Sequence, residues 1–135
     1  MSRSEVLRKS VETFYNEEKN SNILCDILDK KNGVSLRNLE WFVTNYAKKK
    51  NTTYETRDGK KFSVHCSYKS TLDGYSKKLF DPFCRTEKIQ IKIPKSEKTI
   101  QTTVAQLNFI RWCIKNNIVE YFIENQCKLK QNCTV

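Results

Sequence analysis

The residues that could support catalysis are few, and they stand far apart along the chain. His65 is the single histidine, and the cysteines at positions 25, 66, 84, 113, 127 and 133 contain no Cys-x-x-Cys pair. A zinc site would need ligands from distant parts of the chain, and a pair of His65 with Cys84 or Cys113 has no local signature. His65 and Cys66 are adjacent, so on a strand they would point to opposite faces. We expect buried free thiols and no bound metal.

Three aspartates, Asp58, Asp73 and Asp81, are the carboxylates considered for a metal ion in phosphoryl chemistry. Asp58 precedes a glycine and Asp81 precedes a proline, so both have ordinary roles in turns. The chain has only three glycines, which excludes a glycine-rich loop that cradles phosphate. We therefore predict that the protein is not an enzyme and has no catalytic residue and no cofactor.

The net charge is the most distinctive property of the sequence. The 135 residues include 25 Lys and Arg but only 15 Asp and Glu, a net charge of +10. Residues 31–100 carry +9 of this excess, whereas residues 1–30 are slightly acidic at −1. A positive field of this kind favours acidic partners, namely nucleic acid, anionic lipid or an acidic protein surface. The alternative is that the lysines only keep the surface solvated, in a composition typical of AT-rich coding DNA.

An alternating segment at residues 88–93 indicates where a binding face would lie. If its three isoleucines face the core, Lys88, Gln90 and Lys92 share the opposite face, which Lys60 and Lys61 could extend. Tyrosines among cations suit phosphate contacts and stacking on unpaired bases, although the same tyrosines could belong to the core. The predicted nucleic-acid-binding residues are Lys48, Lys49, Lys50, Lys60, Lys61, Lys69, Tyr75, Lys77, Lys78, Arg85, Lys88 and Lys92.

The order of the predicted elements indicates a single compact α+β domain over residues 1–135. We expect an N-terminal helical segment at 1–30, a basic helix–hairpin–strand region at 31–100, C-terminal helices at 101–128 and a polar tail at 129–135. The hairpin and the strand at 88–93 would form a small antiparallel sheet. Residues 67–80 fit no single pattern, because Gly74 interrupts a weak helical one.

Several local signals set the expected ends of these elements. Asn20 or Ser21 would cap the second helix, and Ser35 would cap the third, which runs into Lys48–Lys50. Asp58-Gly59 between two β-prone runs predicts the hairpin turn. A helix beginning near Thr102 would be interrupted at Asn116-Asn117.

Two segments in the second half of the chain resemble a small protein family of the large nucleocytoplasmic DNA viruses. They are residues 67–85, which contain SYKS and YSKKLFDPFCR, and residues 102–112, which contain QLNFIRW. The helix LRNLEWFVTNY at 36–46 is also similar, so the resemblance spans residues 35–122. The resemblance implies a setting, namely an infected host cell with a late or virion-associated role. It does not indicate a particular activity. Asp81 could pair with Arg85 to fix the turn, or Arg85 could bind phosphate with its lysine neighbours.

The setting and the alternative function complete the prediction. The charged first ten residues are unlike a signal peptide, and no apolar run approaches the length of a membrane helix, so we expect the host cytoplasm or nucleus and no membrane partner. The preferred function is binding of DNA or RNA by a viral, non-enzymatic protein. The alternative is a protein–protein interaction module, such as a minor virion component or host-factor binder, anchored by Trp41 and Trp112; both tryptophans could instead belong to the core.

Overall fold

The computed structural model describes residues 3–93, 98–126 and 129 of the chain. Helices dominate these residues, in agreement with the low glycine and proline content. The helices are α1 (Arg3–Tyr15), α2 (Glu18–Leu28), the 3-10 turn η1 (Lys31–Gly33), α3 (Leu36–Trp41), the π-helical turn η2 (Phe42–Tyr46), α4 (Ala47–Lys50), α5 (Val64–Tyr75), α6 (Lys77–Phe80), α7 (Val104–Lys115) and α8 (Ile118–Glu124).

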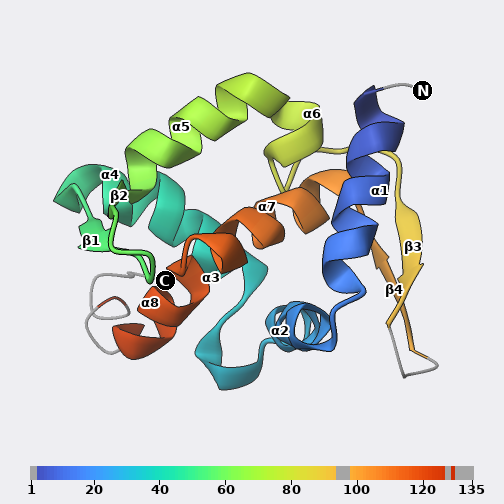
Figure 1. The fold of residues 1–135 in the computed structure, drawn as a ribbon, viewed down its shortest axis with the longest axis horizontal. Coiled ribbons are helices and arrows are strands. Elements are labelled where there is room, and N and C mark those ends of the chain that lie inside the picture. The colour runs from blue at the N-terminus through green and yellow to red at the C-terminus, as the bar shows by residue number, and fades with distance from the viewer. Residues whose placement is uncertain (1–2, 94–97, 127–128, 130–135) are drawn as a thin grey trace.

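Helix α7 runs through the middle of the molecule and is surrounded by the other elements (Figure 1). Residues 107–113 are all buried, including the polar Asn108 and Arg111, because helices cover α7 on several sides. Phe109 packs against Phe80 and Trp112, with ring centroids 5.7 and 5.9 Å apart. Tyr68 of α5 contacts Phe80 and Phe109 as well, so this aromatic cluster holds α6 and α5 against the central helix.

Buried hydrogen bonds also tie α7 to its neighbours. Asn108 Nδ2 donates to the carbonyl oxygen of Leu79 in α6 at 2.9 Å, while Asn108 Oδ1 accepts from Arg111 Nη2 at 2.9 Å. Arg111 Nη1 also donates to Ser10 Oγ in α1 at 2.8 Å, so one network, buried at Asn108 and Arg111, joins three helices. Tyr15 donates its phenolic proton to the carbonyl oxygen of Leu107 at 2.7 Å.

The strands form two separate antiparallel pairs. Strands β1 (Thr53–Glu55) and β2 (Lys61–Ser63) make the predicted hairpin, whose turn has Gly59 at φ +79°. Strand β3 (Ile89–Lys92) pairs with β4 (Thr99–Thr102), with Ile91 opposite Ile100. The expected mixed fold is therefore present, but the hairpin does not join β3: the two pairs lie at opposite ends of the molecule (Figure 1).

Besides the separation of the strand pairs, the structure corrects two further sequence predictions and resolves an open segment. His65 and Cys66 lie in the first turn of α5 and not on a strand. Residues 67–75 continue α5 and residues 77–80 form α6, with Ser76 between them at φ 76°. Residues 67–75 are helical because Tyr68, Leu72 and Tyr75 form a stripe at helical spacing that packs on the core.

The other correction concerns the second helix. Asn20 and Ser21 are buried inside α2, which begins at Glu18, so neither is its N-cap. Asn20 Nδ2 donates instead to the carbonyl oxygen of Phe14, across the junction between α1 and α2.

Several predicted element ends are confirmed. Ser35 Oγ accepts from the backbone N–H of Asn38, and Thr103 caps α7 in the same way through the N–H of Gln106. Asn117, at φ 60°, separates α7 from α8. Most of the predicted tail at 129–135 lies outside the described residues. Within the described part of the chain, no helix has the length and apolar character that crossing a membrane requires.

Candidate nucleic-acid interface

The eleven predicted basic binding residues are all exposed, but they do not form one face. Five lie on α6, on the loop at 81–88 and on β3, and we call them the sheet-end patch: Lys77, Lys78, Arg85, Lys88 and Lys92. Five others lie on α4 and the hairpin, at the opposite end in Figure 1, and we call them the hairpin-end patch: Lys48, Lys49, Lys50, Lys60 and Lys61. Lys69 is on the exposed side of α5 between them.

The orientation of the sheet-end patch follows from the alternation of β3. Ile89 and Ile91 are both 8% exposed, so the intervening side chains must face solvent, as the sequence predicts. The cross-strand neighbours are uncharged, since Gln90 lies opposite Gln101 and Lys92 lies opposite Thr99. The outer face of the β3–β4 pair therefore carries positive charge with no carboxylate directly opposite.

The hairpin-end patch has local explanations for much of its charge. Lys48, Lys49 and Lys50 form the last turn of α4, where cations stabilise the helix dipole. Lys61 lies opposite Glu55 in the hairpin register. The hydrogen bond from Thr56 lowers the pKa of Asp58, and the charge of Lys60 contributes to the same shift. Because of the distance between the two strand pairs, Lys60 and Lys61 do not extend the face of β3, contrary to the sequence prediction.

Two arginines beside the sheet-end patch were missed by the sequence argument. A groove of about 690 Å³ lies between α1, α6 and the start of β3, and Arg3, Arg8 and Lys78 line it with the acidic Glu5 and Glu87. A smaller hollow of about 270 Å³ shares Arg8 and reaches Gln90 and Lys92 on β3. We call the two together the α1–β3 groove. Its charge is mixed, and no sequence signal distinguished these arginines within the slightly acidic residues 1–30.

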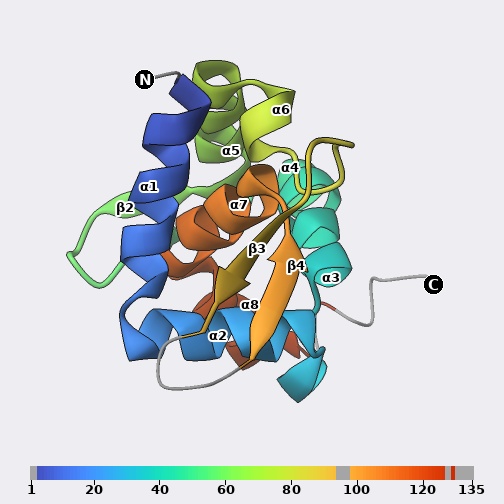
Figure 2. The same ribbon diagram turned by 90° about the vertical axis from the view of Figure 1, so that its right-hand side faces the viewer.

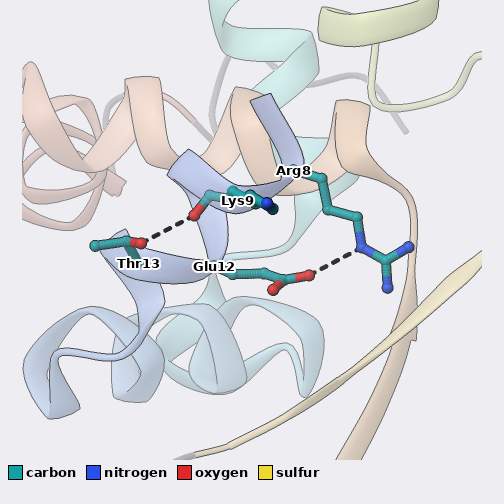
Figure 3. Close-up of polar contacts among 4 residues, drawn as sticks. All are labelled: Arg8, Lys9, Glu12 and Thr13. Atoms are coloured by element: carbon teal, nitrogen blue, oxygen red, sulfur yellow. Dashed lines mark hydrogen bonds and ion pairs between the residues drawn. The ribbon is translucent and has the colours of Figure 1, made fainter. Parts of the chain in front are cut away.

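An ion pair within α1 holds the Arg8 side chain in this groove. Arg8 Nε pairs with Glu12 Oε1 at 2.9 Å, one turn further along α1 (Figure 3). Thr13 Oγ1 donates to the carbonyl oxygen of Lys9 at 2.9 Å beside this pair. Arg3 donates a hydrogen bond to the carbonyl oxygen of Gly74, which ties the start of α1 to the end of α5.

Tyr75 differs from the other predicted binding residues because it is partly buried and its ring packs against the core. The ring stacks on Phe80, with centroids 6.0 Å apart and an angle of 19° between the planes. Tyr68 likewise contacts Phe80 and Trp112, and burial raises its pKa to about 12. Tyr68 and Tyr75 thus pack against the core as partly buried side chains, which is closer to the alternative that the sequence left open.

The candidate catalytic residues are dispersed in the structure. His65 is half-buried at the start of α5, near the Tyr68 ring, and its Nδ1 atom has no hydrogen-bond partner among the described residues. Asp81 Oδ1 accepts from the backbone N–H of Phe83 at 2.9 Å, and Asp73 is exposed on α5. Burial raises the pKa of the Cys113 thiol, which disfavours a reactive thiolate. Across the described ranges, no three His, Cys, Asp or Glu side chains are grouped to hold a metal ion.

Comparison with known proteins places the chain in a family. The sequence model of a group described as "Family of unknown function (DUF7197)" matches residues 1–133. The chain belongs to this family. A relative, "Uncharacterized protein L507" of Acanthamoeba polyphaga mimivirus, is 40% identical over 124 residues, which are 87% of this chain and 48% of the relative. The chain thus spans about half the length of that giant-virus protein. No solved structure matches the chain.

In this family member, the two segments that prompted the viral resemblance contact each other directly. Gln106 Nε2 donates to the carbonyl oxygen of Pro82 at 3.1 Å, next to the bond between Asn108 and Leu79. Among the described residues, no ion pair joins Asp81 to Arg85. Asp81 fixes the turn by accepting a hydrogen bond from the backbone N–H of Phe83. The segment at 75–85 is therefore held on the N-terminal half of α7, which leaves Arg85 exposed.

The large aromatic side chains divide between core and surface. Trp112 is 8% exposed and donates through Nε1 to Ser67 Oγ at 3.3 Å, so it belongs to the core. Trp41 is partly buried and packs near Tyr46. Phe83, by contrast, is 46% exposed. The exposure of Phe83 could not be predicted from the sequence, because an Asp-Pro-Phe turn does not reveal which way its aromatic ring points.

Proposed function

We propose that this domain binds nucleic acid without catalysing a reaction, through the five cations of the sheet-end patch. In the setting that a mimivirus relative suggests, the ligand would be the viral genome or its transcripts in an infected cell, and a virion-associated role would follow from binding the genome. The proposal concerns this domain, because the chain corresponds to only half of that relative.

The proposal rests on exposed cations that make no ion pair among the described residues. Within the described ranges, none of the five sheet-end cations makes an ion pair, whereas Arg57 pairs with Glu120 and Lys98 pairs with Asp29. Exposed cations without a carboxylate partner are available to replace the counterions of a phosphate backbone. The alternation of β3 holds Lys92, one of these cations, on the exposed face of the strand.

The shape of the surface supports a backbone-binding mode. The α1–β3 groove runs beside the patch, and its apolar floor includes Leu79, Ile89 and Val104. Positive side chains next to a furrow can follow a phosphate chain without reading the base sequence. We therefore propose affinity with little sequence preference.

The test is the salt dependence of binding. The equilibrium constant for a fluorescein-labelled oligonucleotide is measured by anisotropy at several salt concentrations. Neutralisation of five phosphates predicts a log–log slope of about −3.5 for a single strand and about −4.5 for a duplex. Absence of binding at about 0.1 M salt, or binding insensitive to salt, would refute the proposal.

A further inference from the structure

Phe83 is the exposed aromatic side chain nearest to the sheet-end patch along the chain, and a fixed turn presents it to solvent. The backbone N–H of Cys84 donates to the carbonyl oxygen of Asp81 at 3.1 Å, and the Asp81 carboxylate accepts from the N–H of Phe83. Pro82 is buried, and its carbonyl oxygen accepts from Gln106 on α7. The ring is therefore held at the surface by a pinned backbone and not by a flexible loop.

A hollow of about 280 Å³ lies beside this ring. We call it the Phe83 hollow, and it is lined by Ile27, Leu28, Lys30, Ser35, Leu36, Arg37 and Phe83. The Arg37 guanidinium lies over the Phe83 ring, 5.6 Å from its centroid. The volume falls just below the ~300–1,000 Å³ of usual small-ligand pockets, which suits one flat ring system.

The charge of the hollow indicates which kind of flat ring system it would bind. Its charged lining residues are Lys30 and Arg37, and no carboxylate lines it, whereas the α1–β3 groove contains Glu5, Glu12 and Glu87. An apolar floor with an aromatic ring and two cations is complementary to a base that carries a phosphate on its sugar.

A basic segment also follows Phe83 along the chain. The loop at 81–88 leaves α6, passes beside α3 and enters β3 (Figure 2). Arg85 follows Phe83 by two residues, and Lys88 ends the loop, so phosphate-binding cations lie along the chain from the ring to the strand.

We infer that the Phe83 hollow takes an unpaired nucleobase, stacked on Phe83 and Arg37, so that the domain prefers single-stranded nucleic acid. This inference rests on the proposed function and specifies its ligand. A base inside a duplex is already stacked and paired, so it cannot reach the ring without being flipped out. A single strand offers its bases freely, and stacking on an aromatic ring tolerates every base.

The experiment compares three probes of equal phosphate count with wild-type protein and variants. The probes are an oligo-dT strand of about 20 nucleotides, longer than the ~4–16 nucleotides that single-strand sites usually cover, an abasic strand and a duplex. The variants are Phe83→Ala, Phe83→Leu and the ring-preserving Phe83→Tyr. Ile123→Ala is the matched control, since Ile123 is a similarly exposed apolar side chain elsewhere.

Loss of one stacked base predicts that Phe83→Ala and Phe83→Leu weaken oligo-dT binding by about 5- to 150-fold. Phe83→Tyr and Ile123→Ala should retain wild-type affinity, and the affinities of all variants for the abasic strand and the duplex should be unchanged. The salt slope should also stay the same, because no cation is removed. Thermal unfolding by circular dichroism checks that each variant folds.

Two results overturn the inference while leaving the proposed function standing. One is salt-dependent binding of oligo-dT that Phe83→Ala does not weaken. The other is an equal loss on the abasic strand, which would show that no base contacts the ring. If wild-type protein binds none of the three probes, the proposed function fails, and a protein ligand for the hollow becomes the better explanation.

Discussion

The substitution Asn108→Ala tests the central polar network of the fold. Asn108 is 2% exposed and joins α7 to α6 through Leu79 while accepting from Arg111. The alanine leaves a carbonyl oxygen of α6 and one guanidinium N–H without their partners. Each unsatisfied buried group costs about 1–3 kcal/mol, and more when charged. We expect a loss of about 3–5 kcal/mol from the free energy of unfolding, out of a usual total of about 5–15 kcal/mol.

The assay is urea unfolding followed by circular dichroism at a helical wavelength. Asn22→Ala is the matched control, because Asn22 is exposed on α2, and it should change the free energy by less than about 0.5 kcal/mol. Arg111→Met and the double variant complete a cycle in which the coupling energy should reach about 1–3 kcal/mol. A loss below about 1 kcal/mol for Asn108→Ala, or additive single effects, would refute this account of the network.

Three further predictions concern capping, alkaline pH and thiol reactivity. Ser35→Ala should lower the free energy of unfolding by about 1 kcal/mol through loss of the α3 cap, measured by urea midpoint, whereas Ser70→Ala on an exposed helix position should not. Burial raises the pKa of Tyr68 to about 12 in the folded protein, against about 10 in the unfolded chain. The stability that the neutral phenol contributes is therefore complete below pH about 10 and is lost as pH rises toward 12. The urea midpoint should fall over that range, and it should fall less steeply in Tyr68→Phe. Exposed Cys66 should react with a thiol reagent before buried Cys113, as peptide mapping by mass spectrometry would show, and equal rates would contradict the burial.

Much of the fold could be predicted because its signals are local. The isoleucines of residues 88–93 place β3 and its exposed Lys92 correctly, since alternation needs no knowledge of the partner strand. Ser35 and Asn117 mark helix boundaries through their own hydrogen bonding and backbone conformation. Asp58-Gly59 marks the hairpin turn for the same reason.

The missed features depend on contacts between distant residues. Val64, His65 and Cys66 favour a strand in isolation, but the stripe that continues through Tyr68 and Leu72 is buried only when the segment is helical. Strand β4 escaped prediction because Ile100 is the one apolar residue among its four.

For the candidate site too, local features could be predicted from the sequence, whereas contacts between distant residues could not. Exposure of the eleven cations followed from residue type, whereas their separation into two patches required the positions of the two strand pairs. Arg8 lines a groove with Lys78 only because α1 packs there, and Phe83 lines a hollow with Arg37 only because the loop at 81–88 packs beside α3. Neither Arg8 nor Phe83 stands out in the sequence.

The most direct measurement compares two triple variants that remove the same charge from opposite ends of the molecule. Lys78→Gln with Lys88→Gln and Lys92→Gln alters the sheet-end patch, and glutamine at Lys48, Lys49 and Lys50 alters the hairpin-end patch. For single-stranded oligo-dT, the sheet-end variant should reduce the magnitude of the log–log salt slope by about 2, while the hairpin-end variant stays close to wild type. Equal losses, or a loss confined to the hairpin-end variant, would contradict the proposed interface.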